Sequence, residues 1–325
     1  MSILKLLFVF LISSSLFLQA NKLEQNQQKK KIIYLVPHMD IAFWKIMAKG
    51  IKNGTDLLGY DLEILSADYS AKKELENTIE AINKKVDGII VSPSSSSACN
   101  TILKFIKKAN IPVVISDIGA NSSDYVSYIS SNNMQGAYEI GKFLSNKMID
   151  KGFQKGDVGI IAVSQKRLNG IQRTSGFLKA MDESNIKVTE LKQLTTRTQE
   201  ESYNITKEMI KNHPNLRAIW IQTSNIYKGV IKAINEEKKQ KDILLVSFDA
   251  EPEFLDLIPK DIILASAMQE PYLMGKTALV NMDNHLNGME VEKNIQLPIL
   301  LISKENIKEK LPLIKLHVLG IEVDD

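Results

Sequence analysis

The chain has 325 residues and a mass of 36.5 kDa, enough for two domains. Hydrophobic residues make up 44% and charged residues 24%, which excludes a disordered, collagen-like or polytopic membrane chain. A formal net charge of +3 gives no broad basic surface, so we expect no nucleic-acid partner, and the single cysteine, Cys99, excludes an intramolecular disulfide and a cysteine-based zinc site.

The first twenty residues have the three parts of a secretory signal peptide. Lys5 supplies a positive charge, residues 6–18 are apolar apart from three serines, and Ala20 is a small residue before a polar stretch. As a helix this apolar segment would rise only about 20 Å, short of the roughly 30 Å hydrocarbon core of a membrane. We therefore expect cleavage near Ala20 rather than a retained anchor, and a periplasmic location.

The first half of the mature chain alternates strands and helices. Its strands are near-continuous apolar runs, and its helices carry apolar residues at helical spacing. We predict strands over 32–37, 61–67, 88–92 and 111–116, with helices over 42–58, 71–85 and 98–109. Strands of this kind, each followed by a helix, indicate a parallel sheet covered by helices on both faces.

The same rhythm then restarts. We predict strands over 126–130, 157–164, 187–194, 216–222, 243–248, 262–268 and 295–301, with helices over 134–149, 170–184, 199–212, 225–237 and 272–286. No glycine- or proline-rich linker separates the two halves, so the connections should be short and ordered. The segment after Ile307 has no clear assignment.

The motifs of common enzymes and cofactor sites are absent. The first strand is followed by no G-x-G-x-x-G, and the chain has no phosphate-binding G-x-x-x-x-G-K-[ST], no H-E-x-x-H and no G-x-S-x-G. Its four histidines lack the spacing of metal ligands. The serine-rich segment 92–97 lacks the glycines and lysine of a phosphate loop and is interpreted as a polar turn. We therefore expect a binding protein without cofactor or metal, not an enzyme.

Polar and aromatic side chains follow the predicted strands, where ligands bind in open parallel sheets. Those at the strand ends include Phe43, Trp44, Asp117, Arg173, Thr196, Arg197, Thr223, Asp249 and Gln269. Carboxylates accept from hydroxyls, amides and arginine bridge oxygens, and aromatic faces pack on sugar C–H groups. Alternatives remain: the aromatic pair could be helix core, the aspartates could be caps or turn formers, and Arg173 could be a surface residue.

The order and spacing of several segments resemble the type I periplasmic sugar-binding proteins, of the ribose-binding kind. The resemblance runs from about Lys31 to about Ile307. It is carried by Phe43-Trp44 with Gly50, Val86–Pro93, Ile111–Val114 with Asp117, Ser131–Asn133 with Gly136, Arg173 with Gly176-Phe177, Phe248-Asp249, and Gln269 with Gly275. It implies two doubly wound α/β lobes joined by a hinge of three crossings. Residues 31–131 with 270–298 would form the N-terminal lobe, and 132–269 with 299–325 the C-terminal lobe.

The resemblance also implies a set of ligand contacts. They are the aromatic pair Phe43 and Trp44, the carboxylates Asp117 and Asp249, Arg173, Gln269, and Thr223 in place of an amide. Three more positions depart from the family pattern: Ile41 and Ser92 stand where asparagines are common, and Ile118 where an arginine is common. These changes remove hydroxyl-binding groups, so we expect a ligand smaller or less hydroxylated than an ordinary pentose or hexose.

Two functions fit this resemblance. The protein would be a monomer that captures a small hydroxylated ligand and delivers it to the membrane permease of an ABC importer. Alternatively it would be a periplasmic sensor subunit that presents a signal molecule to a membrane histidine kinase, similar to the autoinducer-2 receptor. Repressors share the two-lobed fold, but the signal peptide stands where their DNA-binding helices would be.

Overall fold

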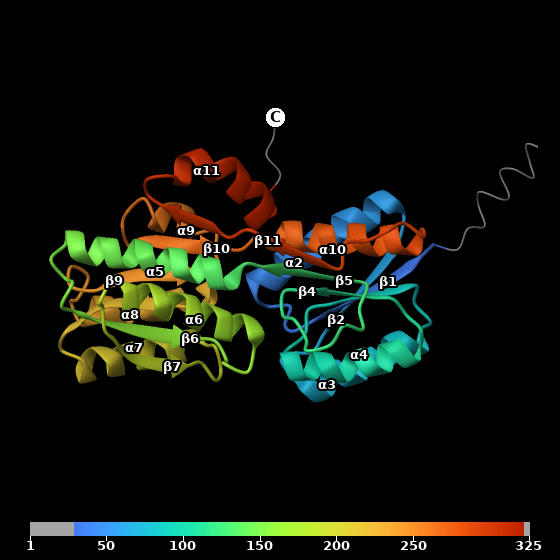
Figure 1. Cartoon of the computed structure of the whole chain (residues 1–325), viewed down its shortest axis with the longest axis horizontal. Helices are drawn as coiled ribbons and strands as arrows, with labels where there is room; N and C mark the ends of the chain where they lie inside the picture. The colour runs from blue at the N-terminus through green and yellow to red at the C-terminus, as the bar shows by residue number, and fades with distance from the viewer. Residues whose placement is uncertain (1–28, 322–325) are drawn as a thin grey trace, which may run out of the picture.

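Two six-stranded sheets, each covered by helices on both faces, make up the computed structural model, which describes residues 29–321 (Figure 1). The α/β fold predicted from the sequence is confirmed. The predicted signal peptide, residues 1–20, lies outside the described residues. Within the described part of the chain, no helix combines the length and the apolar character that a membrane span requires.

Sheet A, with its helices, forms the lobe at the right of Figure 1. Its strands, all parallel, run in the order β11 (Asn294–Leu297), β5 (Ser127–Ser131), β4 (Val113–Ser116), β3 (Gly88–Val91), β1 (Lys31–Val36) and β2 (Asp61–Ser66). Helices α2 (Ala42–Leu58) and α10 (Pro271–Leu286) pack on one face, and α3 (Ala71–Asn83) and α4 (Ser96–Lys108) on the other. Burial on both faces explains why the central strands are apolar throughout.

Sheet B forms the second lobe in the same pattern. Its strands run in the order β12 (Leu300–Ser303), β10 (Ala265–Met268), β9 (Leu244–Phe248), β8 (Leu216–Ile221), β6 (Asp157–Ala162) and β7 (Val188–Gln193). Helices α5 (Asn133–Asp150) and α6 (Leu168–Glu183) cover one face. The other face carries α7 (Gln199–Asn212), α8 (Tyr227–Glu236), α9 (Phe254–Leu257) and α11 (Ile307–Leu313). Position by position, β6 to β10 of this sheet match β1 to β5 of sheet A.

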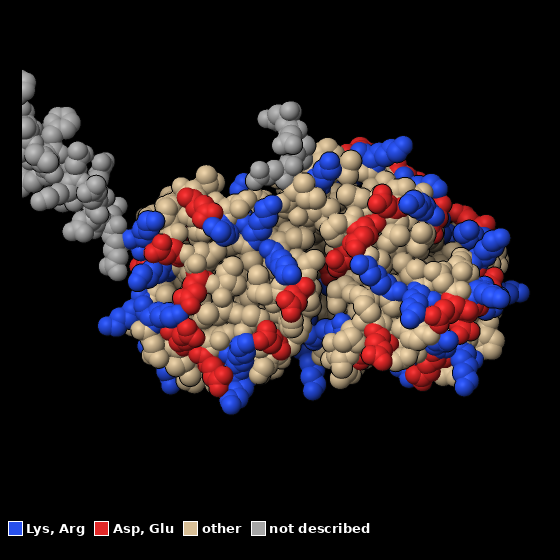
Figure 2. Space-filling view, turned by 180° about the vertical axis from the view of Figure 1, so that it is seen from behind, with Lys and Arg blue, Asp and Glu red and all other residues tan. Residues whose placement is uncertain are grey.

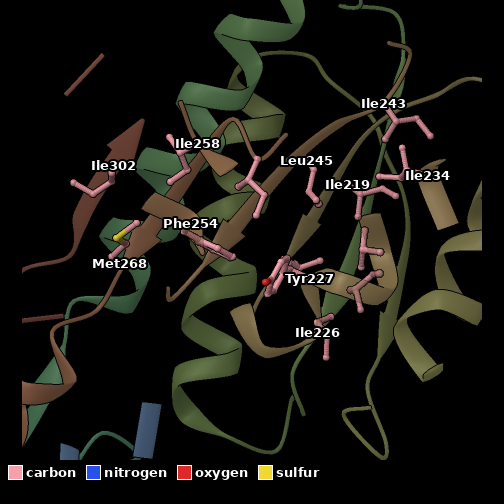
Figure 3. Close-up of a cluster of buried hydrophobic side chains, with 14 of the residues drawn as sticks. Ile219, Ile226, Tyr227, Ile234, Ile243, Leu245, Phe254, Ile258, Met268 and Ile302 are labelled. Carbon is pink, nitrogen blue, oxygen red and sulfur yellow. The ribbon is translucent and has the colours of Figure 1, made fainter. Parts of the chain in front are cut away.

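The core on the second face of sheet B is built mainly from branched aliphatic side chains. Figure 3 shows Ile219 and Leu245 of the sheet beneath Ile234 of α8 and Phe254 of α9. Tyr227 packs edge-on against Phe254, with ring centroids 5.2 Å apart. The β-branched residues that favour strands therefore also supply the packing surface for the helices.

One predicted strand is wrong. The segment 295–301 is not one strand but two, β11 and β12, which belong to different sheets. Pro298 lies between them, and because proline has no backbone N–H it cannot continue a ladder. In addition, β12 pairs antiparallel with β10, so sheet B is not wholly parallel.

The chain passes between the two sheets three times. The crossings are at Asn132, at Gln269-Glu270 and at Pro298-Ile299, each between the end of one element and the start of the next. The C-terminal segment forms α11 and a π-helical turn, η2 (Ile314–Val318), whose apolar residues join the core of the second lobe.

This C-terminal segment also contacts the crossings and the first lobe. His317 Nδ1 lies 3.0 Å from an oxygen of Glu270 at the second crossing. Lys49 of α2 donates to the carbonyl oxygen of Gly320 at 2.6 Å. The segment therefore touches both lobes beside the crossings.

Charged side chains are mixed over the surface. Figure 2 shows Lys and Arg interspersed with Asp and Glu across both lobes of the displayed face, without an extended area of one sign. The displayed face therefore lacks the extended basic area that binding of a polyanion requires.

The close packing of α2 on α10 yields a first prediction. A Cβ atom on Gly50 would overlap the backbone carbonyl oxygen of Tyr272 in α10, which cannot move aside. Gly50→Ala should therefore lower the free energy of unfolding by about 1–3 kcal/mol in urea titrations, despite the better helix propensity of alanine. Gly54→Ala is the matched control, since its Cβ would overlap only a terminal methyl group of the Leu279 side chain, which can shift more readily than a backbone carbonyl. An equal loss in both variants would contradict this.

Candidate functional site

A small cavity of about 40 Å³ lies between the two lobes, at the carboxyl ends of the strands. The first lobe lines it with Ile41, Phe43, Trp44, Tyr69 and Asp117. The second lobe contributes Val163, Arg167, Asn169, Arg173, Arg197, Thr223, Asn225 and Asp249, and Gln269 comes from the second crossing. All seven residues proposed from the sequence thus meet at one cavity.

The two aspartates occupy equivalent places in the two lobes. Asp117 follows β4 and Asp249 follows β9, strands that hold the same position in their sheets. Each has a positive φ, 71° and 68°, and each donates its backbone N–H to the neighbouring strand at 2.9 Å. Aspartate tolerates this left-handed conformation better than most residues. Neither aspartate directly precedes a helix, so neither is a helix cap, and each forms the bend that ends its strand.

Arg173 is buried and joins several elements of the second lobe. Its Nε donates to Asn133 at 2.8 Å and its Nη1 to the carbonyl oxygen of Gln222 at 2.7 Å. Nη1 also lies 3.5 Å from Asp249 Oδ2, and the guanidinium stacks on Phe248 at 3.9 Å. The alternative of a surface arginine is wrong, because Arg173 is 3% exposed.

Asp249 has further support from the second crossing. Gln269 Nε2 donates to Asp249 Oδ1 at 2.6 Å. Burial raises the pKa of Asp249, while the charge of Arg173 and this hydrogen bond oppose the rise. The three side chains form one buried polar group at the wall of the cavity.

Asp117 is less well paired. One oxygen accepts from Asn169 of the opposite lobe at 3.4 Å, whereas Oδ1 has no partner among the described residues. Burial raises the pKa of Asp117 to about 6, although the Arg173 guanidinium opposes the rise. A hydroxyl donor in the cavity would supply the missing hydrogen bond.

The aromatic pair has divided roles. Trp44 is 4% exposed and belongs to the core of the first lobe, yet it also lines the cavity. Phe43 meets it edge-on with ring centroids 4.8 Å apart. Trp44 Nε1 donates to the hydroxyl of Tyr69 at 3.2 Å. Trp44 therefore belongs to the core and also lines the cavity, while Phe43 packs against that core and lines the cavity beside it.

Thr223 lines the cavity but uses its hydroxyl within the protein, donating to Asn225 Oδ1 at 2.7 Å. Of the other positions that depart from the family pattern, Ile41 lines the cavity, while Ile118 and Ser92 are buried elsewhere in the first lobe. Ser92 shares a hydrogen bond with Tyr34.

Several cavity residues were not selected from the sequence. Arg197 lies in the loop between β7 and α7, and it is among the predicted strand-end residues but not among the predicted ligand contacts. Tyr69 lies in the loop after β2, and Arg167 immediately precedes α6. Ligands bind at the carboxyl ends of parallel strands, and all three residues lie in loops at those ends. Which side chains of these loops line the cavity is determined by contacts across the cleft.

Direct contacts join the lobes beside the cavity. Arg167 Nε donates to the carbonyl oxygen of Ser94 at 3.1 Å, and the backbone N–H of Leu168 donates to Ser96 at 3.3 Å. The start of α6 in the second lobe therefore touches the start of α4 in the first.

Four buried polar atoms at the cavity lack a hydrogen-bond partner among residues 29–321. They are two acceptors, Asp117 Oδ1 and Gln269 Oε1, and two donors, Arg167 Nη2 and Arg197 Nε. Buried polar atoms are nearly always paired in folded proteins, so this cluster fits a bound polar molecule with both acceptors and donors. In the same part of the chain, no three His, Cys, Asp or Glu side chains come together as a metal site.

A larger hollow of about 550 Å³ lies elsewhere on the second lobe, between the end of α8 and the start of β9. Its charged groups are Lys151, Lys241, Lys260 and Asp261 around an apolar floor. It lies at the amino ends of the strands and shares no residue with the cavity between the lobes, which is the better candidate for a ligand site.

The pairing of Asp117 yields a second prediction. Its pKa is raised from 3.8 to about 6, so the folded protein binds this proton more tightly than the unfolded chain. Stability is therefore lost as the pH rises through this range, and the full cost is present at pH 8. Asp117→Asn should stabilise the ligand-free protein by about 2–3 kcal/mol at pH 8 and by little at pH 4.

Urea titrations at both pH values would test this. The control is Asp56→Asn, an exposed position on α2, which should change stability by less than about 0.5 kcal/mol at either pH. A destabilised Asp117→Asn protein at pH 8 would contradict the prediction.

Comparison with known proteins agrees with this geometry. Residues 32–290 match the sequence profile of the periplasmic binding protein domain. The ribose import binding protein of Bacillus subtilis is 26% identical over 277 residues, 85% of this chain and 88% of that protein. The D-apiose import binding protein of Paraburkholderia graminis is 26% identical over 262 residues, 80% of this chain and 82% of that one.

Solved structures show the same fold. A carbohydrate transporter solute-binding protein from Agrobacterium radiobacter, crystallised in complex with D-arabinose, superimposes with a TM-score of 0.81 at 22% identity. The match covers 90% of this chain and all of that one. The profile match, the relatives and the two-lobed architecture agree, and the chain belongs to the type I periplasmic sugar-binding proteins.

Proposed function

We propose that this protein is a periplasmic solute-binding protein that captures a small, hydroxylated, sugar-like ligand between its lobes and delivers it to an ABC importer. The observation that carries the proposal is the set of four unpaired buried polar atoms at the cavity between the lobes. Atoms from both lobes take part, so a ligand that satisfies them must touch both lobes.

The comparisons support the same reading. The curated relatives are import binding proteins for ribose and D-apiose, and members of the family are binding proteins rather than enzymes. The family is periplasmic, which agrees with removal of residues 1–20 after export. The small cavity and the departures at Ile41 and Thr223 favour a compact ligand.

Each of the seven residues has a role in this proposal. Asp117 and Asp249 accept hydrogen bonds from ligand hydroxyls, and Arg173 holds Asp249 and balances its charge. Gln269 offers its free carbonyl oxygen to a donor on the ligand. Phe43 and Trp44 pack against ligand C–H groups, while Thr223 shapes the wall through its bond to Asn225.

Binding is coupled to closure of the lobes. Asp117 and Asp249 come from different lobes, so a ligand that bonds to both favours the closed arrangement by those additional contacts. The three crossings are the hinge, with the lobes divided at 131/132, 269/270 and 298/299. A membrane permease can then distinguish loaded from empty protein by the relative position of the lobes.

A thermal-shift screen of pentoses, hexoses, polyols and small oxygenated metabolites, followed by calorimetry, tests the binding function. Deletion of the gene should then abolish uptake of the ligand so identified. Unimpaired uptake, with loss of a transcriptional response to the same ligand, would instead support a sensor subunit and contradict delivery to an importer.

A third prediction concerns affinity. Asp249→Ala removes an acceptor for a ligand hydroxyl and should weaken binding by about 1–3 kcal/mol in calorimetry. Asp249→Asn keeps one oxygen and the shape of the site and should weaken binding less. Asp242→Ala, at an exposed position that pairs with Lys239, is the control and should bind as the native protein does. Native affinity in Asp249→Ala would refute the proposed contact.

A further inference from the structure

Arginine is distributed very unevenly in this protein. The chain has 37 lysines and only four arginines, at 167, 173, 197 and 217. Three of the four arginines line the cavity between the lobes, and none of the lysines within residues 29–321 does. Arginine differs from lysine in its planar fork of donors, which matches the paired oxygens of a carboxylate or phosphate.

Only one of the three cavity arginines has its charge paired. Arg173 lies 3.5 Å from Asp249 and donates to two further oxygens. Arg167 and Arg197 have no carboxylate within 4.0 Å among the described residues. Asp117 and Glu74 are the carboxylates whose charges act on Arg167, but neither lies close enough to form an ion pair with it.

The two unpaired arginines are held on one aromatic ring. The guanidinium carbon of Arg197 lies 4.0 Å from the centre of the Tyr69 ring, and that of Arg167 lies 5.4 Å from it. Trp44 fixes the hydroxyl end of this ring by its hydrogen bond. Attraction of a guanidinium group to an aromatic ring does not consume all of its N–H donors, so donors remain for a ligand.

Some of those N–H donors have no partner among the described residues. Arg167 is 6% exposed, and only its Nε has a partner, Ser94, while Nη2 is buried without one. Arg197 Nε is likewise buried without a partner among the described residues. Burial is the main cause that lowers the pKa of Arg167 to about 10, and repulsion by the charge of Arg197 adds to it. An anion between them would relieve this repulsion.

We propose that the ligand carries an anionic oxygen group, a carboxylate or a phosphate, which Arg167 and Arg197 bind together beside Tyr69. This inference rests on the proposed function and narrows it: the hydroxyl-bearing part of the ligand lies at Asp117 and Asp249, and the anion lies at the arginine pair. The ligand class is then a small sugar acid or sugar phosphate rather than a neutral sugar. Arg173, which the family pattern shares, is not part of the anion site.

Matched neutral and anionic ligands test the proposal. Ribose, ribonate and ribose 5-phosphate form one set, galactose, galactonate and galacturonate a second, and inorganic phosphate is tested alone. Thermal shift and calorimetry should show an anionic member bound at least 100-fold more tightly than its neutral counterpart. Comparison of the sugar acids with the sugar phosphate shows whether the anionic group of the ligand is a carboxylate or a phosphate.

Variants locate the effect. Arg167→Gln and Arg197→Gln should each weaken binding of the anionic ligand 10-fold to 100-fold, and the loss for the neutral counterpart should be at least tenfold smaller, because it lacks the charged group. Arg217→Gln is the control, because this fourth arginine lies on β8 against Phe153 and does not line the cavity. Equal loss for both members of a pair would overturn the anion site.

A measurement without ligand gives an independent check. Because the two guanidinium groups repel each other and lack carboxylate partners, Arg197→Gln should leave the melting temperature of the ligand-free protein unchanged or raise it. A clear decrease would indicate a structural role and overturn the proposal. Tightest binding of a neutral sugar, with unaltered affinity in the arginine variants, would refute the anion site and leave the proposed function intact. If no compound of this panel or of the broader screen stabilises the protein, both the proposed function and the anion site are contradicted.

Discussion

The burial of two carboxylates at facing strand ends is the constraint on which the cleft depends. A buried carboxylate is costly unless its charge is paired and its oxygens accept hydrogen bonds. Asp249 meets this requirement within the protein, through Arg173 and Gln269. Asp117 meets it only in part, through Asn169 of the opposite lobe. The carboxylate of the second lobe is therefore paired within the protein, while that of the first lobe depends on the other lobe or on a ligand.

This asymmetry connects stability to binding. Polar atoms without partners lower the stability of the ligand-free protein and are the atoms that gain most when a ligand supplies the missing bonds. Removing such a group can stabilise the fold while weakening the function, which is the usual conflict at binding sites. The raised pKa of Asp117 and the lowered pKa of Arg167 both have burial as their main cause, so the electrostatics of the cavity follow from its closure.

The architecture permits this closure because the lobes are separate bodies joined by short connections. Each lobe has its own sheet and its own cores on both faces, and only three brief crossings link them. The C-terminal segment adds contacts beside the crossings, from His317 to Glu270 and from Lys49 to Gly320. Each lobe therefore has its own packing, and the cleft lies where the two lobes meet.

The sequence by itself determined the alternation of strands and helices, because buried parallel strands require continuous apolar runs and covering helices require an apolar face. It also placed Asp117 and Asp249 near the cleft, since their strand-end positions are local features, and Arg173 in the helix that follows β6. Contacts between segments far apart in the sequence decided the strand pairing at the sheet edges and the remaining side chains of the cavity. The division at Pro298 into two strands of different sheets depends on which edge each half meets. The stacking of Arg167 and Arg197 on Tyr69 depends on the approach of one lobe to the other, and no local pattern in the chain encodes that distance.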